Sequence, residues 1–158
     1  MKFITDGMLG KLTRWLRMLG YDVKYSRSLN DEQLMEIAKN EHRILLTCDL
    51  ELYRHATAAQ GINAFFVERT TGAKKLANLA KRFNLTLEFD VTVSRCPKCN
   101  TKIKPVLKER IIGKVHETTA TYYDEFWECP NCQQIYWQGA HWNRIESTLR
   151  EAREYLSK

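Results

Sequence analysis

The sequence contains little of several residue types that mark whole classes of protein. It has only 3 Pro and 7 Gly among 158 residues, too few for a collagen-like chain or a proline-rich linker. No apolar run approaches the roughly 20 residues of a membrane-spanning helix, and the first residues lack the apolar stretch of a signal peptide. We therefore expect a soluble, cytoplasmic protein with no membrane partner.

The composition is that of a folded, basic protein. Hydrophobic residues make up 44% of the chain, which is enough for a packed core, and the length suits one domain or one small domain with an appendage. The net charge of +6 is spread along the chain rather than confined to a tail. A polyanion is thus a reasonable partner, although many proteins that never bind nucleic acid have a similar charge.

The N-terminal stretch predicts a strand, an acidic residue and a helix. A short apolar run at residues 3–5 stops at Asp6 and Gly7. Apolar side chains then recur at three- and four-residue steps, which places them on one helical face: Leu9, Leu12, Trp15, Leu16 and Leu19. Gly20 follows where a left-handed C-terminal cap is favoured.

Strand and helix patterns alternate as far as residue 90. Further strands are expected at residues 21–25, 43–48 and 62–67, and helices at 31–41, 50–60 and 72–83. Asn30 and Gln33 have the spacing of a capping box at the start of the second helix. Strands that alternate with helices through short loops predict an α/β fold, doubly wound around a mainly parallel sheet, over residues 1–90.

Residues 91–158 have a different character, and we expect a zinc ribbon with a C-terminal helix. Segments prone to form strands occur around residues 106–112, 122–127 and 135–137, with Gly113 as a turn between the first two. Residues 141–156 have the periodicity of a helix.

Two C-P-x-C pairs predict a structural zinc site. Each pair presents two thiolates on a tight turn, and the 29 residues between the pairs suit an inserted hairpin. The ligands would be Cys96, Cys99, Cys129 and Cys132. Because four thiolates fill the coordination shell of zinc, no position is left for substrate. The alternative is two reduced or disulfide-linked pairs. Cys48 is left over and suits a small buried apolar position.

Three aspartates are candidate ligands of a catalytic Mg²⁺ or Mn²⁺. Asp6 and Asp49 each end an apolar strand just before a helix, and the carboxyl ends of parallel strands share one edge of a sheet. Asp31 begins a helix whose start should reach the same edge. Converging carboxylates suit a hard divalent cation. The alternative is that all three only cap helix N-termini, where aspartate is favoured.

Several other residues have both a functional and a structural interpretation. Arg14 and Arg17 can bind phosphate or occupy an exposed helix face. His141 can act as a general acid, contact substrate or cap the start of the last helix. One helix has a basic cluster that either binds nucleic acid or is simply solvated: Lys74, Lys75, Lys81 and Arg82. The aromatic residues of the ribbon either stack on bases or form its core: Phe126, Trp127, Tyr136 and Trp137.

The motifs together resemble a known family. The runs DGMLGKLTRWLRMLGYD, DEQLMEIA and RILLTCD, the two C-P-x-C pairs and IYWQGAH are similar to the Mut-seven C-terminal RNase-like family, which joins a PIN-like ribonuclease domain to a zinc ribbon. The resemblance extends from about Phe3 to His141. It implies a PIN-like fold and hydrolysis of RNA phosphodiester bonds that depends on Mg²⁺ or Mn²⁺.

The resemblance also implies roles for individual residues. Asp6, Asp31 and Asp49 would hold the catalytic metal, and Thr47 is the hydroxyl residue of a T-x-D element. Matching positions imply substrate contact for Arg14, Arg17, Thr47 and His141. The fourth acid of many PIN domains has no assigned counterpart here.

Two other functions are open. One is a non-catalytic module with a degenerate PIN-like domain that binds RNA or a ribonucleoprotein. The other is a receiver-like phosphorylation domain, which also has acids at strand ends. Receiver-like domains usually have two adjacent acids after the first strand, and this pair is absent here because Asp6 is followed by Gly7.

Overall fold

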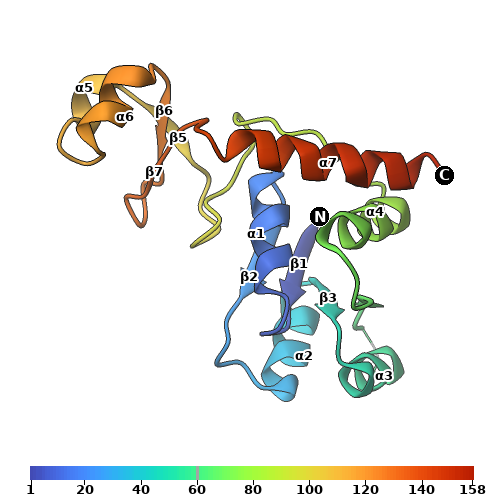
Figure 1. Cartoon of the computed structure of the whole chain (residues 1–158). Coiled ribbons are helices and arrows are strands. Elements are labelled where there is room, and N and C mark those ends of the chain that lie inside the picture. Colours follow the sequence, from blue (N-terminus) through green and yellow to red (C-terminus); the bar gives the residue numbers. More distant parts are fainter. Residues whose placement is uncertain (60) are drawn as a thin grey trace.

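The N-terminal part of the chain is built on a four-stranded parallel sheet. The computed structural model describes residues 1–59 and 61–158. The strands lie in the order β2 (Asp22–Tyr25), β1 (Lys2–Thr5), β3 (Ile44–Thr47) and β4 (Ala64–Phe66). Helices α1 (Gly10–Met18), α2 (Asp31–Asn40) and α3 (Leu50–Ala58) connect successive strands, and α4 (Gly72–Phe83) follows β4 (Figure 1).

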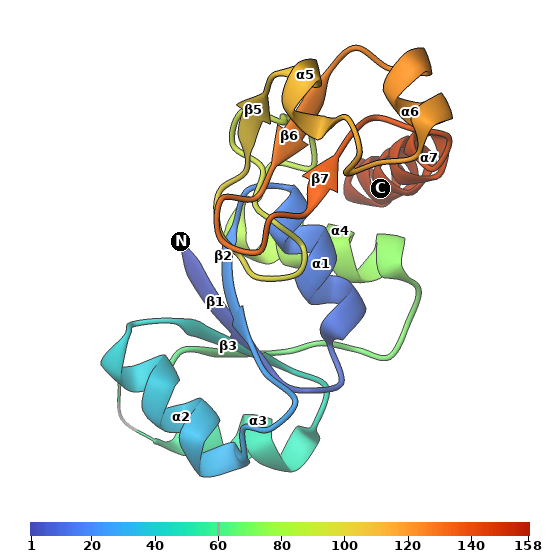
Figure 2. The ribbon, with the colours of Figure 1, turned by 90° about the vertical axis from the view of Figure 1, so that its left-hand side faces the viewer.

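Helices cover both faces of this sheet. Side chains alternate along a strand, so Phe3 and Leu46 enter one core, whereas Ile4 and Leu45 enter the other. Helices α1 and α4 supply apolar residues to the first core, and α2 and α3 to the second. The ribbon views show the two pairs of helices on opposite sides of the strands (Figure 2). The predicted doubly wound α/β fold is therefore confirmed.

The capping box predicted before α2 is present. The Asn30 side chain accepts a hydrogen bond from the backbone N–H of Gln33 over 2.9 Å, and the Gln33 side chain accepts one from the backbone N–H of Asn30 over 3.0 Å. Two otherwise unpaired N–H groups are thereby satisfied at the helix start.

The C-terminal helix packs against the N-terminal layer. Helix α7 (Trp142–Leu156) buries Leu149 and Ala152 in the same core as Leu76 of α4. The ammonium group of Lys74 lies 5.4 Å from the ring centroid of Tyr155. Contacts between α4 and α7 thus join the N-terminal α/β layer to the C-terminal helix. A division into independently folding domains near residue 90 stays a prediction.

A second, antiparallel sheet follows the first cysteine pair, and the second pair lies between its last two strands. Its order is β5 (Lys104–Val106), β6 (Phe126–Glu128) and β7 (Ile135–Tyr136). Two short helices, α5 (Lys108–Ile111) and α6 (Glu117–Tyr122), lie between β5 and β6. Among the residues described, no helix is both long and apolar enough to cross a bilayer.

The strands expected at residues 106–112 and 122–127 were largely wrong. Only Val106 in the first range and Phe126 and Trp127 in the second belong to strands. Leu107 and Ile112 are exposed, and Ile111 alone between them is fully buried, against Phe126. A helical turn delivers one apolar side chain to a small core in this way, whereas a strand would bury alternate residues. The expected inserted hairpin is thus a helical insertion, and Gly113, at φ 84°, turns the chain within it.

Candidate functional site

The carboxyl ends of β1 and β3 lie side by side. Thr5 pairs with Leu46 in the parallel register, and the backbone N–H of Asp6 donates to the carbonyl of Leu46 over 3.1 Å. Asp6 therefore leaves the sheet next to the point where β3 ends at Thr47. This is the edge at which open α/β sheets bind their ligands.

The Asp6 side chain is buried and held by three donors. Its Oδ2 accepts hydrogen bonds from the Thr47 hydroxyl over 2.5 Å and from the Cys48 N–H over 3.0 Å. Its Oδ1 accepts one from the Met8 N–H over 2.8 Å. Only 6% of the residue is exposed. These bonds fix the position of the carboxylate and stabilise its negative charge.

Asp49 and Asp31 occupy different positions at helix starts. Asp49 is the cap of α3, and its Oδ1 accepts hydrogen bonds from two backbone N–H groups. Asp31 is exposed in the first turn of α2, but Asn30 is the cap of that helix. Asp6 precedes α1, whose cap residue, Leu9, makes no side-chain bond. The helix-cap interpretation therefore describes Asp49 alone.

Thr47 connects the two acids that follow adjacent strands. Its hydroxyl donates to Asp6 and accepts from the backbone N–H of Asp49 over 3.0 Å. Mg²⁺ typically takes one or two carboxylates and fills its remaining positions with water or substrate oxygens. The carboxylate oxygens at this edge are therefore suitable ligands for a hard cation, which Asp6 and Asp49 would hold.

The three aspartates are not gathered as tightly as the cysteines. In residues 1–59 and 61–158, the four cysteines form the only group of three or more possible ligands whose ligand atoms all lie within 4.8 Å of one another. The predicted joint role of Asp6, Asp31 and Asp49 as metal ligands stays a prediction.

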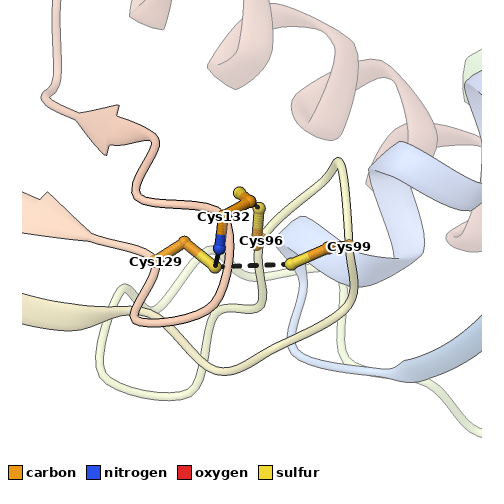
Figure 3. Close-up of side chains that lie close together, drawn as sticks. All are labelled: Cys96, Cys99, Cys129 and Cys132. Atoms are coloured by element: carbon orange, nitrogen blue, oxygen red, sulfur yellow. Dashed lines mark hydrogen bonds between the residues drawn. The ribbon is translucent and has the colours of Figure 1, made fainter.

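The four cysteines have the geometry of a zinc centre (Figure 3). The Sγ atoms of Cys96 and Cys132 are 3.6 Å apart, and those of Cys99 and Cys129 are 3.3 Å apart. These distances exceed the ~2.05 Å of a disulfide bond. They are close to the ~3.8 Å edge of a tetrahedron with Zn–S bonds of ~2.3 Å. The cluster can therefore hold zinc, as the spacing predicted.

The two cysteine turns have the same backbone construction. The N–H of Asn100 donates to the carbonyl of Cys96 over 2.9 Å, and the N–H of Gln133 donates to the carbonyl of Cys129 over 2.8 Å. Both Asn100 (φ 73°) and Gln133 (φ 64°) adopt the left-handed conformation. Each turn thus reverses the chain directly after its second cysteine.

The aromatic residues of the ribbon mainly support this centre. Tyr136 places its hydroxyl 3.0 Å from the Sγ of Cys96, and burial together with the neighbouring thiols raises the pKa of that hydroxyl. Phe126 is buried, and Trp137 packs against it with ring centroids 6.2 Å apart. Phe126 and Trp137 thus belong to the core of the ribbon, the structural alternative of their two interpretations, whereas Trp127 lies outside that core and lines a hollow with Tyr122 and Gln138.

Arg17 joins α1 to the first cysteine turn. Its Nε and Nη2 donate to the carbonyl of Val23 over 3.0 and 2.8 Å. Its Nη1 donates to the carbonyls of Pro97 and Lys98 over 3.0 and 3.2 Å. Burial lowers the pKa of Arg17, while the nearby Cys99 and Cys96 oppose that shift. Since a zinc ion with four thiolates has a net charge of about −2, the guanidinium also complements the charge of the metal centre.

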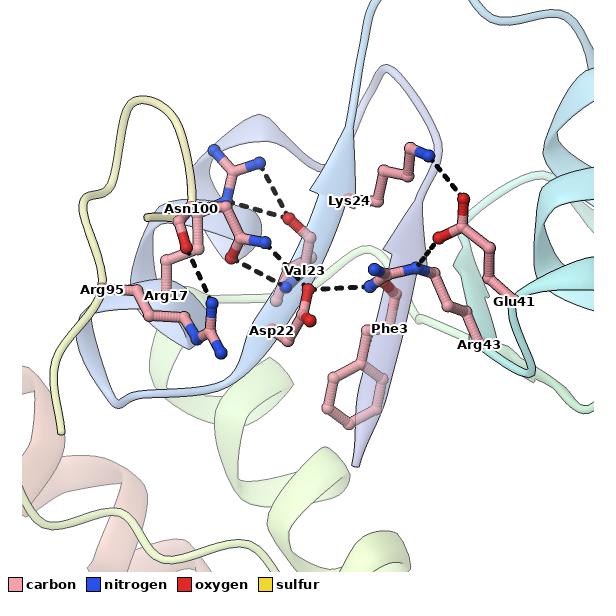
Figure 4. Close-up of polar contacts among 9 residues, drawn as sticks. All are labelled: Phe3, Arg17, Asp22, Val23, Lys24, Glu41, Arg43, Arg95 and Asn100. Carbon is pink, nitrogen blue, oxygen red and sulfur yellow. Dashed lines mark hydrogen bonds and ion pairs between the residues drawn. The ribbon is translucent and has the colours of Figure 1, made fainter. Parts of the chain in front are cut away.

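A second set of contacts ties the same turn to β2 (Figure 4). The Asn100 side chain accepts from the Val23 N–H over 3.0 Å and donates to Asp22 over 2.8 Å, where Arg43 also donates over 2.8 Å. Burial would raise the pKa of Asp22, but the bonds from Arg43 and Asn100 outweigh it and lower that pKa. The sequence alone did not reveal this role of Asn100, although its position directly after a C-P-x-C pair is a local signal for it.

His141 lies away from the acidic edge. It precedes α7 and makes no side-chain cap bond. The next residue, Trp142, packs edge-to-face against Phe89, with ring centroids 4.4 Å apart. Phe89 and Gly20 line the same hollow, so this region is next to the C-terminal end of α1 (Figure 1). Asp6 precedes the opposite end of that helix. The predicted substrate contact of His141 stays a prediction.

The fold and these sites define a mixed α/β protein with a polar strand edge and a four-cysteine metal centre. The model of the Mut7-C RNAse domain family matches residues 1–149. The chain therefore belongs to this family, as its motifs suggested, and the family points to a nuclease-like role. Comparisons with curated proteins and with solved structures found no match.

Proposed function

We propose that this protein is a ribonuclease that hydrolyses RNA phosphodiester bonds with the help of Mg²⁺ or Mn²⁺. Membership of an RNAse domain family supports the reaction class. The observation that carries the proposal is the buried carboxylate of Asp6, which Thr47 and two backbone N–H groups hold at the carboxyl edge of the sheet.

The residues at the edge have distinct roles in this proposal. Asp6 and Asp49 hold the cation, with Asp31 completing the set, and Thr47 orients Asp6. A bound divalent ion supplies an activated water and offsets charge that develops at the phosphate. Arg14, which is exposed on α1, shares that charge, and His141 contacts a more distant part of the RNA.

Hydrolysis follows a simple balance of atoms. The oxygen of the water forms a bond to phosphorus, and the bond from phosphorus to the 3′ oxygen breaks. The water loses a proton to solvent, and the leaving oxygen takes one up. The products are a 5′-phosphate and a 3′-hydroxyl. The zinc centre has a structural role, because four thiolates leave no coordination position for substrate.

Two substitutions test the site. We expect Asp6→Asn and Asp49→Asn to lower metal-dependent cleavage of RNA by about 100-fold or more, since several kcal/mol of charge stabilisation would be lost. Asp124→Asn is the matched control, because the Asp124 side chain is 90% exposed in the ribbon. Circular dichroism checks that each variant is folded. Undiminished cleavage by both edge variants would refute the proposed site.

The alternative function is a non-catalytic module that binds RNA or a ribonucleoprotein. The observation that favours it is the separation of the three aspartates, which do not form a close ligand group among the described residues. This alternative predicts RNA binding that weakens with salt but no turnover with Mg²⁺ or Mn²⁺. Product formation by purified protein, with the Asp6→Asn variant as blank, decides between the two.

A further inference from the structure

A basic cavity lies between the α/β layer and the first cysteine turn. Its volume is about 500 Å³, within the range of ligand-binding sites. Its walls come from α1, from the end of β2 and from the C-P-K-C turn. The side chains that give it its character are Lys11, Arg14, Arg17, Tyr25, Arg27 and Lys98.

The exposed charged side chains of this cavity are all positive: Lys11, Arg14, Arg27 and Lys98. No acidic residue lines it. The Lys98 ammonium donates to the Gln134 side chain over 2.7 Å, and the Arg27 Nε donates to the Tyr25 hydroxyl over 3.3 Å, so both contacts are to neutral groups. Among the residues that the structure describes, no cation of the cavity pairs with a carboxylate. Like charges gathered without carboxylate partners favour an anionic partner.

One end of the cavity adjoins the acidic edge. The Tyr25 hydroxyl donates to the carbonyl of Gly7 over 3.0 Å, and Gly7 directly follows Asp6. A Cβ at Gly7 would lie only 3.5 Å from the Cα of Arg27, so the turn after Asp6 packs against the segment that carries Arg27. The cavity thus begins near the loop that follows Asp6, the residue to which the proposed function assigns the reaction.

The other end reaches the cysteine turn. From Gly10 to Arg17 the wall follows α1 for about 10 Å, at a rise of ~1.5 Å per residue. Lys98 stands at the far end, on the turn between Cys96 and Cys99. Arg17 holds this turn in place, because its donors are directed to the carbonyls of Val23, Pro97 and Lys98. It supports the wall, and the exposed cations Lys11, Arg14, Arg27 and Lys98 face the solvent.

We propose that this cavity binds the phosphodiester backbone of single-stranded RNA and guides it from the acidic edge to the first cysteine turn. The inference rests on the proposed function in taking RNA as the substrate, and it adds the path of the strand and the residues Lys11, Arg27 and Lys98. The zinc turn in this arrangement forms one wall of the substrate channel.

The shape and charge of the cavity favour a single strand over other anions. Positive side chains distributed along about 10 Å of helix match successive phosphates better than one small anion. A double-stranded RNA is contacted mainly across its wide minor groove, whereas a cavity of about 500 Å³ admits only a short length of one strand. Basic grooves that follow the backbone are typical of single-strand binding.

Fluorescence anisotropy with a short labelled single-stranded RNA tests the inference. The zinc-loaded chain of residues 1–158 is used without added Mg²⁺ or Mn²⁺, so that the RNA stays intact. We expect Arg14→Gln/Arg27→Gln to weaken binding by about 10-fold or more at low salt. We also expect the slope of log K against log salt to become shallower by about 1.4, or ~0.7 for each lost phosphate contact.

The matched control is Lys39→Gln/Arg150→Gln, which removes the same charge from exposed positions on α2 and α7. It should weaken binding by less than about 3-fold, the effect of net charge alone. An equal loss in both double variants, or no loss in the cavity variant, would overturn the inference. Full competition by an equivalent concentration of inorganic phosphate would also overturn it, because the site would then bind a single small anion.

Failure of this inference can be told apart from failure of the proposed function. Asp6→Asn should bind RNA as tightly as the unaltered chain while losing cleavage. If the unaltered protein binds through the cavity but never cleaves, the strand path stands and the ribonuclease proposal fails. If cleavage occurs and the cavity variant keeps its full affinity, the reaction stands and the strand path fails.

Discussion

The hydroxyl of Thr47 donates a hydrogen bond to the Asp6 carboxylate over 2.5 Å, although 41 residues separate the two in sequence. The parallel pairing of β1 with β3 creates this contact, because it places the ends of both strands at the same edge. Thr47 is fully buried, so the bond is shielded from water. The same hydroxyl accepts from the backbone N–H of Asp49, and it thereby links the Asp6 carboxylate to the backbone at the start of α3.

Thr47→Val should therefore impair both stability and cleavage. The methyl group that replaces the hydroxyl leaves an Asp6 oxygen with one donor fewer, at a cost of about 1–3 kcal/mol in unfolding free energy. If Asp6 holds the catalytic cation, we expect cleavage to fall by about 10- to 100-fold, as is typical when a partner of a metal ligand is removed. Urea unfolding and an RNA cleavage assay measure the two effects.

Two further variants make the Thr47 result specific. Thr47→Ser keeps the hydroxyl and should retain most of the activity. Thr57→Val removes an exposed hydroxyl that bonds only within α3, and it should leave cleavage unchanged. Full activity in Thr47→Val would show that the orientation of Asp6 by this bond is irrelevant to function.

Arg17→Met should destabilise the junction between α1 and the first cysteine turn. The substitution leaves the carbonyls of Val23, Pro97 and Lys98 without their charged donor. Hydrogen bonds to charged groups contribute about 1.5–3 kcal/mol each. We expect the free energy of unfolding, measured in urea, to fall by about 3 kcal/mol in total. Arg17→Lys should be intermediate, since lysine keeps the charge but not the planar fork.

The stability control for Arg17 is its neighbour one turn earlier. Arg14 is exposed, and Arg14→Met should change the unfolding free energy by less than about 0.5 kcal/mol. If Arg17→Met has an equally small effect, the observed contacts of Arg17 are not what holds the cysteine turn against β2.

The parts of the fold that local patterns encode were predictable. The apolar runs that end at Asp6 and Asp49 belong to strands buried on both faces, which gives them a continuous hydrophobic signal. The capping box at Asn30 depends on residues only three positions apart. The C-P-x-C pairs encode their turns locally, so the cysteine cluster followed from spacing alone.

Features that depend on long-range contacts were not predictable in the same way. Helix α5 forms because a single residue, Ile111, completes a small core with Phe126 and Ile135, and no periodicity in such a short segment signals it. Arg17 has the spacing of an exposed helical residue near the edge of the apolar face. Its burial results from a turn 80 residues further along the chain, which a local pattern does not encode.

The candidate site was predictable only in part for the same reason. Topology brought Asp6 and Asp49 to one edge, because parallel strands end together. The distance between these two residues also depends on side-chain hydrogen bonds, such as the one that Thr47 donates. Arg27 and Lys98 were not singled out from the sequence, since each appears there as an isolated basic residue in a loop.

Gly139 in the W-Q-G-A-H run should not tolerate a side chain. A Cβ at Gly139 would lie 2.8 Å from the Nε1 of Trp137, and this ring packs in the core of the ribbon. We expect Gly139→Ala to lower the unfolding free energy by about 1–3 kcal/mol, the usual effect of overpacking. Gly72→Ala is the control, because a Cβ there meets no atom within 4 Å. It should be neutral or stabilising by up to about 1 kcal/mol. Thermal unfolding compares the two, and equal effects would contradict the expected clash.

Zinc binding should weaken as the pH falls. Burial would raise the pKa of Cys99, but hydrogen bonds, first of all with Thr101, lower it to about 6. Burial raises the pKa of Cys129 to about 12, so this thiol keeps its proton at neutral pH until zinc displaces it.

Because the metal binds thiolates and releases protons, its affinity should rise with pH, and the stability that it adds should be lost on acidification. Release of zinc to a coloured chelator at a series of pH values measures this dependence. Tyr136→Phe removes the hydroxyl beside Cys96. Burial raises the pKa of Cys96, and the hydrogen bond with this hydroxyl counters that rise. The half-release point of this variant should therefore lie at a higher pH than that of the unaltered chain. An affinity that is constant from about pH 6 to pH 8 would contradict coordination by thiolates.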